Sequence, residues 1–346
     1  MSDHAIEVVR IKEVEPHPNA DTLGIVRVHG WTCCVRLGDW KEGDLAAYII
    51  PDSVVDSERP EFAFLKGNER IKVKRLRGVY SQGLLVPAPD GLQEGDDAAG
   101  ALGVEHYDPE LHLPNTLKAG SEAEAPPPGF IPKYDVENFR RYPDLFLPGE
   151  EVVVTEKIHG ANARFCYTTS PGIERDHGPN FTVRFDESRF WAGSKTEWKR
   201  YDPHNLWWRA LLQAPTLQEF LRQNPDFVAY GENYGSVQNL KYGVPPGEIR
   251  LVIIDLWHVK EGRFLDFVWA QAVFHDAIRY RQWAPVLYRG PFDAERIIAL
   301  AEGPSTIPGA DHLREGVVVR PVVERMDDRH GRVQLKIVSD RYLEKG

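Results

Sequence analysis

Three consecutive prolines divide this chain. The stretch Ala125-Pro126-Pro127-Pro128-Gly129 contains three residues without a backbone N–H, so it cannot continue a helix or a central strand. Residues 98–132 around it show neither helical nor alternating apolar periodicity. Because 346 residues are also more than one small core needs, we predict two domains. They are an N-terminal module at residues 1–115 and a larger domain at residues 136–346, joined by a linker at residues 116–135.

The N-terminal module is predicted to be all-β. Turn residues such as Gly38-Asp39 and Glu42-Gly43-Asp44 separate short runs of strand-forming residues. The runs are Ile6 to Val14, Leu23 to Val28, Thr32 to Arg36, Leu45 to Ile50, Ile71 to Leu76 and Gly83 to Pro87. Five or six short strands in about 90 residues are typical of a small closed barrel such as an OB-fold.

The larger domain combines helical and strand patterns. Apolar residues recur at helical spacing from Asp202 to Gln223, where Pro215 should divide the helix, and again from Trp269 to Arg281. Strands are predicted at Phe181 to Arg184, Phe227 to Tyr230, Ile249 to Val259, Gly316 to Val322 and Arg332 to Val338. The larger domain is therefore expected to be α+β.

Composition excludes several classes of protein. A hydrophobic share of 42% and a charged share of 27% are those of a soluble globular protein. No apolar run approaches the roughly 18 residues that span a bilayer, and the N-terminal residues lack a signal-peptide pattern. The expected location is cytoplasmic. Three cysteines, two of them adjacent at Cys33 and Cys34, form neither a disulfide framework nor a zinc spacing.

The net charge of −10 argues against nucleic-acid binding by the chain as a whole, because Lys and Arg neutralise phosphates. One run departs from this average. Lys66 to Arg77 holds six basic residues against one acid, and within it Lys72, Lys74, Arg75 and Arg77 are the candidate nucleic-acid contacts. The alternative for this run is a solvated strand face.

One lysine is placed for chemistry. The β-branched run Val152 to Thr155 predicts a buried strand, Gly160 permits a turn, and Ala161 to Tyr167 alternates like a second strand. Lys157 therefore lies at a strand end and should face a cleft. If desolvation or a nearby cation lowers its pKa, the free amine can attack an electrophilic phosphorus. The alternative is an ordinary solvated lysine at a turn.

The residues around Lys157 resemble a known motif. Lys157-Ile158-His159-Gly160, with Glu156 before it and Asn162 after it, resembles the nucleotidyl-lysine motif of the covalent nucleotidyltransferases, and most closely that of RNA ligases. Further stretches resemble the family's later motifs in order. They are Gly193-Ser194-Lys195-Thr196, Tyr230 to Gly235, Leu251 to Trp257, Glu315 to Arg320 and Leu335 to Val338.

The N-terminal module carries a second resemblance. His17 to Leu23, Gly43-Asp44 and Arg77 to Leu84 are together similar to the tRNA-binding OB modules attached to some tRNA synthetases. The likeness implies a module that binds a nucleic-acid backbone. Only ten residues follow Lys336, so the chain resembles the stand-alone bacterial RNA ligases with an N-terminal OB module. This implies an α+β nucleotidyltransferase domain with antiparallel sheets.

The resemblance implies a role for each motif residue. Lys157 would form a covalent lysyl-AMP, and Glu156 would lie at the adenine end of the pocket. Asn162 would hold a metal-bound water, since Mg²⁺ keeps most of its hydration. Lys195 stands where the family usually has an arginine that contacts the ribose and the strand end. Glu232 would bind the ribose hydroxyls.

Three further positions complete the expected site, which should lie entirely after residue 136. Ile254 stands where relatives often place an aromatic ring under the adenine. Glu315 would hold a catalytic metal, directly or through water, and Lys336 would contact the α-phosphate. Relatives often have a second lysine where this chain has Val338, so phosphate neutralisation should depend more on metal.

The function implied is ATP-dependent sealing of 3′-hydroxyl and 5′-phosphate breaks in RNA. ATP donates AMP to the lysine, AMP passes to the 5′-phosphate, and attack by the 3′-hydroxyl releases it. The expected cofactor metal is Mg²⁺ or Mn²⁺, and the expected partner is a nicked duplex with RNA at the break. No membrane is involved, and a monomer is expected. The alternatives are a GTP-using capping-type nucleotidyltransferase and a nucleic-acid-binding protein with an inactive transferase domain.

Overall fold

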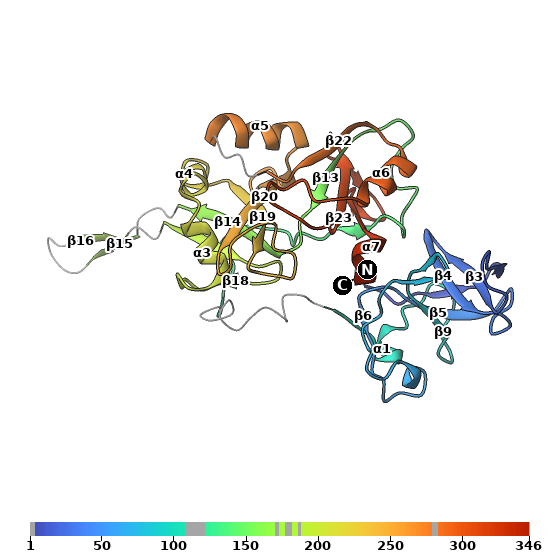
Figure 1. The fold of residues 1–346 in the computed structure, drawn as a ribbon. Coiled ribbons are helices and arrows are strands. Elements are labelled where there is room, and N and C mark those ends of the chain that lie inside the picture. Colours follow the sequence, from blue (N-terminus) through green and yellow to red (C-terminus); the bar gives the residue numbers. More distant parts are fainter. Residues whose placement is uncertain are drawn as a thin grey trace.

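The computed structural model describes residues 4–107, 122–169, 173–176, 182–185, 188–278 and 283–345. It has the two predicted modules, a small barrel at the N-terminus and a larger domain of two β-sheets with helices (Figure 1). None of the helices in these residues is long and apolar enough to cross a membrane.

The N-terminal module is all-β, as predicted. Its strands pair in four groups. They are β1 (Val8–Arg10), β5 (Leu45–Ile49) and β9 (Leu84–Pro87); β2 (Glu15–Pro16), β3 (Leu23–Val28) and β4 (Trp31–Arg36); β7 (Lys74–Leu76) and β8 (Val79–Ser81); and β6 (Ser53–Val54) and β10 (Glu105–His106). The first strand is shorter than the predicted Ile6 to Val14, because Ile11 exchanges backbone hydrogen bonds with Gly43 and Asp44 instead. Short helices η1 (Ala63–Leu65) and α1 (Ala99–Leu102) complete the module.

The larger domain contains two mostly antiparallel sheets. The first has seven strands in the order β11 (Ala123–Glu124), β18 (Trp198–Lys199), β17 (Arg189–Gly193), β14 (Ala161–Thr168), β19 (Phe227–Gly235), β20 (Ile249–His258) and β21 (Arg263–Phe264). The second has five strands in the order β12 (Glu137–Asn138), β26 (Leu335–Val338), β23 (Gly316–Pro321), β13 (Glu151–Lys157) and β22 (Val286–Pro291). Two small hairpins, β15 (Ile173–Asp176) with β16 (Thr182–Phe185) and β24 (Met326–Asp327) with β25 (Gly331–Arg332), lie outside these sheets. The predicted strand at Phe181 to Arg184 begins outside the described residues.

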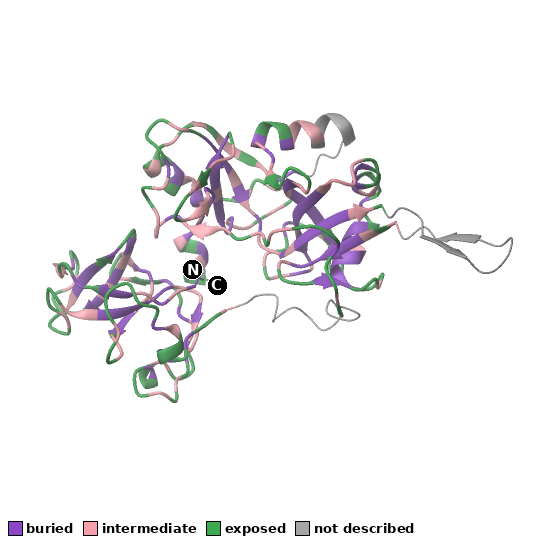
Figure 2. Ribbon diagram, turned by 180° about the vertical axis from the view of Figure 1, so that it is seen from behind, coloured by how far each residue is buried: buried purple, intermediate pink, exposed green. Residues whose placement is uncertain are grey.

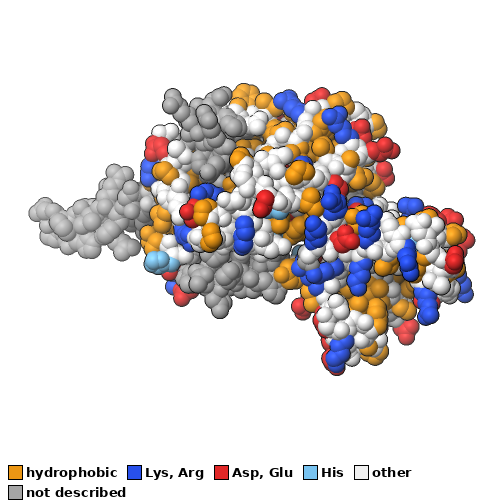
Figure 3. All heavy atoms as spheres, viewed as in Figure 1, with side chains coloured by type: hydrophobic (Ala, Val, Ile, Leu, Met, Phe, Trp, Pro, Cys, Tyr) orange, Lys and Arg blue, Asp and Glu red, His pale blue; other side chains and the backbone are white. Residues whose placement is uncertain are grey.

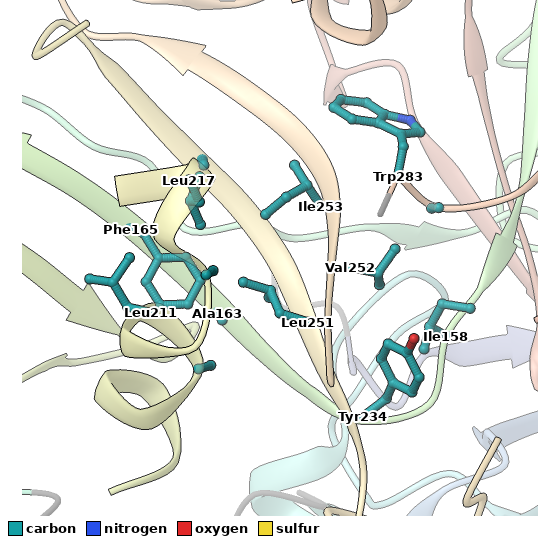
Figure 4. Packing of buried hydrophobic residues seen from close by; sticks show 14 of the residues in the cluster. Ile158, Ala163, Phe165, Leu211, Leu217, Tyr234, Leu251, Val252, Ile253 and Trp283 are labelled. Atoms are coloured by element: carbon teal, nitrogen blue, oxygen red, sulfur yellow. The ribbon is translucent and has the colours of Figure 1, made fainter. Parts of the chain in front are cut away.

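Helices cover the sheets and bury their apolar faces. The helical stretch predicted from Asp202 to Gln223 forms α3 (Leu206–Leu212) and α4 (Pro215–Gln223). Pro215 is the first residue of α4, the position where its missing N–H costs nothing. The remaining helices are α5 (Phe267–Ile278), α6 (Ala294–Ala301) and α7 (Asp340–Lys345). Side chains from α3 and α4 pack on the seven-stranded sheet around Phe165, Leu211 and Leu217 (Figure 4).

The two strands on either side of the Lys157 turn belong to different sheets. β13 lies in the five-stranded sheet and β14 in the seven-stranded sheet. Gly160, in the turn between them, approaches the facing backbone closely, and a Cβ there would lie 1.9 Å from the carbonyl oxygen of Asn233. Only glycine fits this position, so the turn carries the chain from one sheet to the other.

Part of the predicted linker belongs to the larger domain. Residues 116–121 lie outside the described residues, whereas β11 pairs with β18. Between β11 and residue 136, Tyr134 donates a hydrogen bond to Asp255 at 3.0 Å, and the carbonyls of Phe130 and Pro132 accept hydrogen bonds from Trp257 and Tyr230. The prolines prevent regular structure, as predicted, but the aromatic residues after them supply apolar surface that packs on the sheet.

The modules meet at α7. Asp340 accepts hydrogen bonds from Gln82 of the barrel at 2.6 Å and from Arg140 of the larger domain at 2.9 Å. The backbone N–H of Gly30 donates to the carbonyl of Arg140 at 2.8 Å. Each module has its own buried interior, drawn in purple in Figure 2, and these polar contacts join the two.

Candidate functional site

A cavity of about 330 Å³ lies between the two sheets of the larger domain. It brings together all eight residues predicted for the nucleotide pocket. They are Glu156, Lys157, Asn162, Lys195, Glu232, Ile254, Glu315 and Lys336. Residues separated by up to 180 positions in the chain therefore share one cavity, while the role of each stays a prediction.

Strand pairing in the five-stranded sheet arranges one wall of this cavity. Lys157 pairs with Gly316, and Thr155 pairs with Val318, which in turn pairs with Lys336. Because side chains alternate between faces along a strand, Lys157, Thr155, Val318 and Lys336 project from the same face. That face lines the cavity, and the opposite face packs against α6.

Lys157 is paired with Glu315 in this structure. Its Nζ donates hydrogen bonds to Oε1 and Oε2 of Glu315, both at 2.7 Å. Burial would lower the pKa of Lys157, but the carboxylates of Glu315 and Glu232 outweigh burial and raise it. The condition for a free amine, a lowered pKa, is therefore not met while Glu315 is the partner of Lys157. The lysine is held as an ammonium and must lose Glu315 and a proton before it can attack.

Glu315 is held as a carboxylate by two neighbours. Burial would raise its pKa, but Lys157 and His159 outweigh burial and lower the pKa to about 2. The His159 ring lies 3.7 Å from Glu315, and its backbone N–H donates to the hydroxyl of Tyr242 at 2.6 Å. A charged carboxylate therefore stands beside Lys157 over the whole neutral pH range.

The side chain of Glu156 is held by hydrogen bonds within the protein and does not project into the cavity. Its carboxylate accepts hydrogen bonds from the hydroxyls of Ser305 and Thr306 at 2.5 and 2.6 Å and from the Thr306 backbone N–H at 2.7 Å. Glu156 is only 2% exposed, and it precedes Lys157 on β13, so its side chain projects from the other face. Glu156 can therefore contact a ligand in the cavity through its backbone.

The opposite wall carries a suitable set of metal donors. Asn162 on β14 pairs with Glu232 on β19, and its Oδ1 is buried without a hydrogen-bond partner. With Glu315 across the cavity, these residues offer the amide and carboxylate oxygens that Mg²⁺ and Mn²⁺ accept alongside water. No cluster of three or more His, Cys, Asp or Glu side chains occurs within the described ranges. Asn162 and Glu315 thus fit a partly hydrated cation.

A β-bulge directs Ile254 into the cavity. Tyr230 pairs with Asp255 and Gly231 pairs with Ile253, so Ile254 is the extra residue of β20. Bulges re-aim side chains and are frequent beside active sites. Phe267, at the start of α5, also lines the cavity. An aromatic ring is therefore present near Ile254, although it comes from a different element than the family resemblance implies.

The cavity was expected to be formed entirely by residues after residue 136, but two earlier residues also line it. Tyr134 lines it, and so does His106 of the N-terminal module. Lys195 forms an ion pair with Asp135, just before the predicted domain start. Tyr134 and Asp135 were missed because the prolines suggested an unstructured linker.

Beneath the cavity lies a buried charge network that the sequence patterns did not reveal. Asp255 is fully buried and accepts hydrogen bonds from Arg320 at 2.6 Å and from Arg332 at 2.7 Å. Burial would raise the pKa of Asp255, but the two guanidinium groups outweigh burial and lower it. Glu324 bonds both arginines as well. The network joins β20 of one sheet to β23 of the other.

Asp255→Asn should destabilise the protein by about 3 kcal/mol, because removing one member of a buried charged pair leaves its partners uncompensated. Urea unfolding at pH 7, followed by intrinsic fluorescence, measures the change. Asp328→Asn is the matched control, since Asp328 is exposed. Equal stabilities of the two variants would show that Glu324 alone neutralises the arginines.

The end of the basic run of the N-terminal module forms one strand of a surface hairpin, with Lys72 just before it. Lys72, Lys74, Arg75 and Arg77 are all exposed, and β7 and β8 are joined by Arg77-Gly78, both with positive φ. This is the backbone of a type I′ turn. Lys and Arg side chains are frequent on the N-terminal module and where the modules meet (Figure 3). Nucleic-acid contact by this run stays a prediction.

The His17 to Leu23 motif supports that hairpin. The ring of His17 lies within hydrogen-bond distance of the Leu76 carbonyl, at 3.2 Å, and Asn19 donates to the carbonyl of Arg77 at 3.0 Å. The motif therefore positions the β7–β8 turn. The motif itself contains no Lys or Arg that could contact a phosphate.

Some cavity residues could have been found by counting along strands. Gln334 precedes Lys336 by two positions, so alternation places it on the cavity side. Val318 and Arg320 come three and five positions after Glu315, so only the pairing of Val318 with Lys336 shows that they face the cavity. No such signal exists for Phe267 or His106, which reach the cavity through the packing of distant elements.

Comparison with known families and proteins agrees with this geometry. A family model described as RNA ligase matches residues 150–338, and a model of an OB-fold domain matches residues 5–88. The chain is also 36% identical over 100 residues to the phenylalanine–tRNA ligase beta subunit of Symbiobacterium thermophilum. That match spans 28% of this chain and only 10% of the length of that relative.

Solved structures of an RNA ligase from Naegleria gruberi have the same fold. A variant solved without ligand is 24% identical, with a TM-score of 0.78, covering 100% of this chain and 99% of that chain. A variant solved with ATP and Mn is 24% identical, with a TM-score of 0.77, covering 98% of each chain. The likeness confirms the predicted fold class, an OB-fold module followed by an α+β domain with antiparallel sheets.

Proposed function

The chain belongs to the RNA ligase family, and we propose that it is an ATP-dependent enzyme that seals nicks between a 3′-hydroxyl and a 5′-phosphate through a lysyl-AMP on Lys157. The observation that carries the proposal is the shared cavity. The one lysine at the end of β13 faces a carboxylate, a second lysine and an unpartnered amide oxygen there.

The chemistry follows from these neighbours. The Lys157 amine attacks the α-phosphorus of ATP, a P–N bond forms, the bond to the β-phosphate oxygen breaks, and pyrophosphate leaves with the bonding electrons. Lys336, on the same sheet face, would hold the α-phosphate oxygens. Glu232 and the backbone of Glu156 would contact the ribose and the base. The AMP is then transferred to a 5′-phosphate, and attack by a 3′-hydroxyl releases it.

A divalent cation fits this site. Asn162 and Glu315 would hold it, with water completing its coordination. When bound, it would neutralise charge that develops on the phosphates. The Naegleria gruberi RNA ligase has been solved with ATP and Mn and with AMP and Mn, which supports ATP as the AMP donor here. Because Glu315 is the partner of Lys157, a ligand that draws Glu315 away from Lys157 also removes a carboxylate that raises the pKa of this lysine.

Incubation with labelled ATP or GTP tests the first step and separates the candidates. Label from ATP retained on the denatured protein supports the proposal. Label from GTP alone would favour a capping-type nucleotidyltransferase, and no label with either metal would favour a binding protein with an inactive transferase domain. Sealing of nicks with each combination of ribose and deoxyribose at the break then identifies the strand substrate.

Val338→Lys should lower the metal concentration needed for adenylylation. Val338 lies two residues after Lys336 on β26 and therefore on the same face, so a lysine there would add a fixed cation near the phosphates. Titration of Mg²⁺ and Mn²⁺ against the rate of lysyl-AMP formation measures the effect. Val323→Lys, at an exposed valine, is the control. An unchanged metal requirement would contradict this account of Val338.

A further inference from the structure

We propose that the two modules together form a phosphate site, to which His106 of the N-terminal module contributes beside Lys195 and Lys336 of the ligase domain. The inference rests on the proposed function, since it names the part of the ligase substrates that the site takes. That part is a phosphate group beyond the one that reacts with Lys157.

Two cavities meet at these three residues. A cavity of about 130 Å³ lies between the modules, and His106, Lys195 and Lys336 line both this cavity and the nucleotide cavity. All three side chains carry nitrogen donors that can bind phosphate oxygens. The nucleotide cavity therefore adjoins the interdomain cavity at a basic boundary.

The placement of apolar and basic side chains in the nucleotide cavity indicates that the phosphates of a nucleotide would point toward that boundary. Ile254, Phe267 and Val318 offer apolar surface for a base, whereas Lys336 is shared with the interdomain cavity. Since the α-phosphate must lie at Lys157, any further phosphate would extend along the lysines and away from the apolar side chains. His106 is the group that the N-terminal module places on this path.

His106 is exposed, and strand pairing and one ring contact set its position. His106 pairs with Ser53 between β10 and β6, and its ring centroid lies 4.2 Å from that of His4. His4 is in turn within hydrogen-bond distance of the Ser53 hydroxyl at 2.9 Å, and Ser53 donates to the carbonyl of Ile50 at 2.7 Å. The backbone at His106 is therefore held in place, and its exposed ring is accessible to a ligand.

The acidic groups of the interdomain cavity are already neutralised. Asp52 forms an ion pair with Arg70 at 2.8 Å, and Asp340 forms one with Arg140 at 2.9 Å. Both carboxylates line the cavity, so without these partners they would repel a phosphate. Val338 also lines the interdomain cavity. His106 therefore lines the same cavity as Val338, the position where relatives often have a second lysine.

Two phosphates could use this site at different stages. One is the pyrophosphate that leaves when Lys157 takes AMP from ATP. The other is the 5′-phosphate of the strand, whose oxygen attacks the α-phosphorus of lysyl-AMP, so that the P–N bond breaks and the lysine recovers its amine. Both are phosphate groups beside the same α-phosphorus, and kinetics of the separate steps distinguish them.

His106→Ala tests the site in the full-length protein, with His204→Ala as the matched control because His204 is exposed and lies outside both cavities. Three quantities are measured. They are the single-turnover rate of lysyl-AMP formation, the rate of AMP transfer from isolated lysyl-AMP enzyme to a 5′-phosphate nick, and the binding of inorganic pyrophosphate by calorimetry. His106→Gln, which keeps an N–H donor, should recover part of any loss.

We expect His106→Ala to slow at least one step by about ten- to a hundredfold, the range for loss of one charge-assisted hydrogen bond. A loss confined to ATP, with weaker pyrophosphate binding, identifies the leaving group, and a loss confined to the nick identifies the 5′-phosphate. Unchanged rates and pyrophosphate binding would overturn the inference. So would losses accompanied by a lower unfolding temperature. Weaker pyrophosphate binding in a protein that forms no lysyl-AMP would support the site and count against the proposed function.

Discussion

Lys157→Ala is expected to abolish the covalent label from ATP. Lys157 is the residue that β13 places against Glu315 inside the cavity, and it pairs with Gly316 across the sheet. Lys195 and Lys336 line the same cavity, but Lys195 lies in the turn after β17 and Lys336 lies two strands away from β13, so neither can replace its amine in line with the α-phosphorus. Gel electrophoresis of the denatured protein after incubation with labelled ATP measures the effect.

Two comparisons separate lost chemistry from lost folding in this variant. Removing Lys157 leaves Glu315 buried without its cation, which could destabilise the fold. Sealing of a nick that already carries a 5′-adenylate needs no lysyl-AMP, so the variant should retain it. Lys260→Ala, at an exposed lysine on the surface, should retain the label. Label on the Lys157→Ala protein would contradict the assignment of the nucleophile.

Neutralising the basic hairpin should weaken binding to a nicked duplex without preventing adenylylation. In the part of the chain that the structure describes, Lys72, Lys74 and Arg75 are exposed and make no ion pair. Replacing all three by alanine should flatten the salt dependence of binding by about one unit of slope per lost phosphate contact. Binding titrations at several salt concentrations measure the slope. A triple alanine variant at Lys12, Arg36 and Lys41, exposed positions outside the run, is the control.

Deleting residues 1–121 should have the larger effect on sealing. Apart from His106, every residue that lines the nucleotide cavity lies after residue 121, so the remaining domain should still form lysyl-AMP, more slowly if His106 binds the leaving pyrophosphate. Sealing should fall, and fall further with rising salt, because contacts to the backbone position the strand without taking part in the chemistry. A truncated protein that seals like the full chain at about 0.15 M ionic strength would show that the barrel serves another purpose.

The sequence by itself determined the local pieces of this protein. β-branched runs, turn residues and helical spacing predicted the barrel, the strands that hold Lys157 and Lys336, the strand that follows Glu315, and the helix break at Pro215. These features depend on residues close in sequence, whose steric and hydrogen-bonding preferences act wherever the strand is placed.

Only the tertiary structure decided how the pieces meet. Period-two patterns specify faces but not partners, so nothing local indicated that β13 and β14 enter different sheets. Glu315 reaches Lys157 across 158 positions and raises its pKa, reversing the expectation from burial alone. His106 of the N-terminal module lines the cavity of the larger domain, and the hydrogen bond between Gln82 and Asp340 joins the two modules. These outcomes depend on which apolar faces stack and which charges are desolvated together, and both are properties of long-range packing.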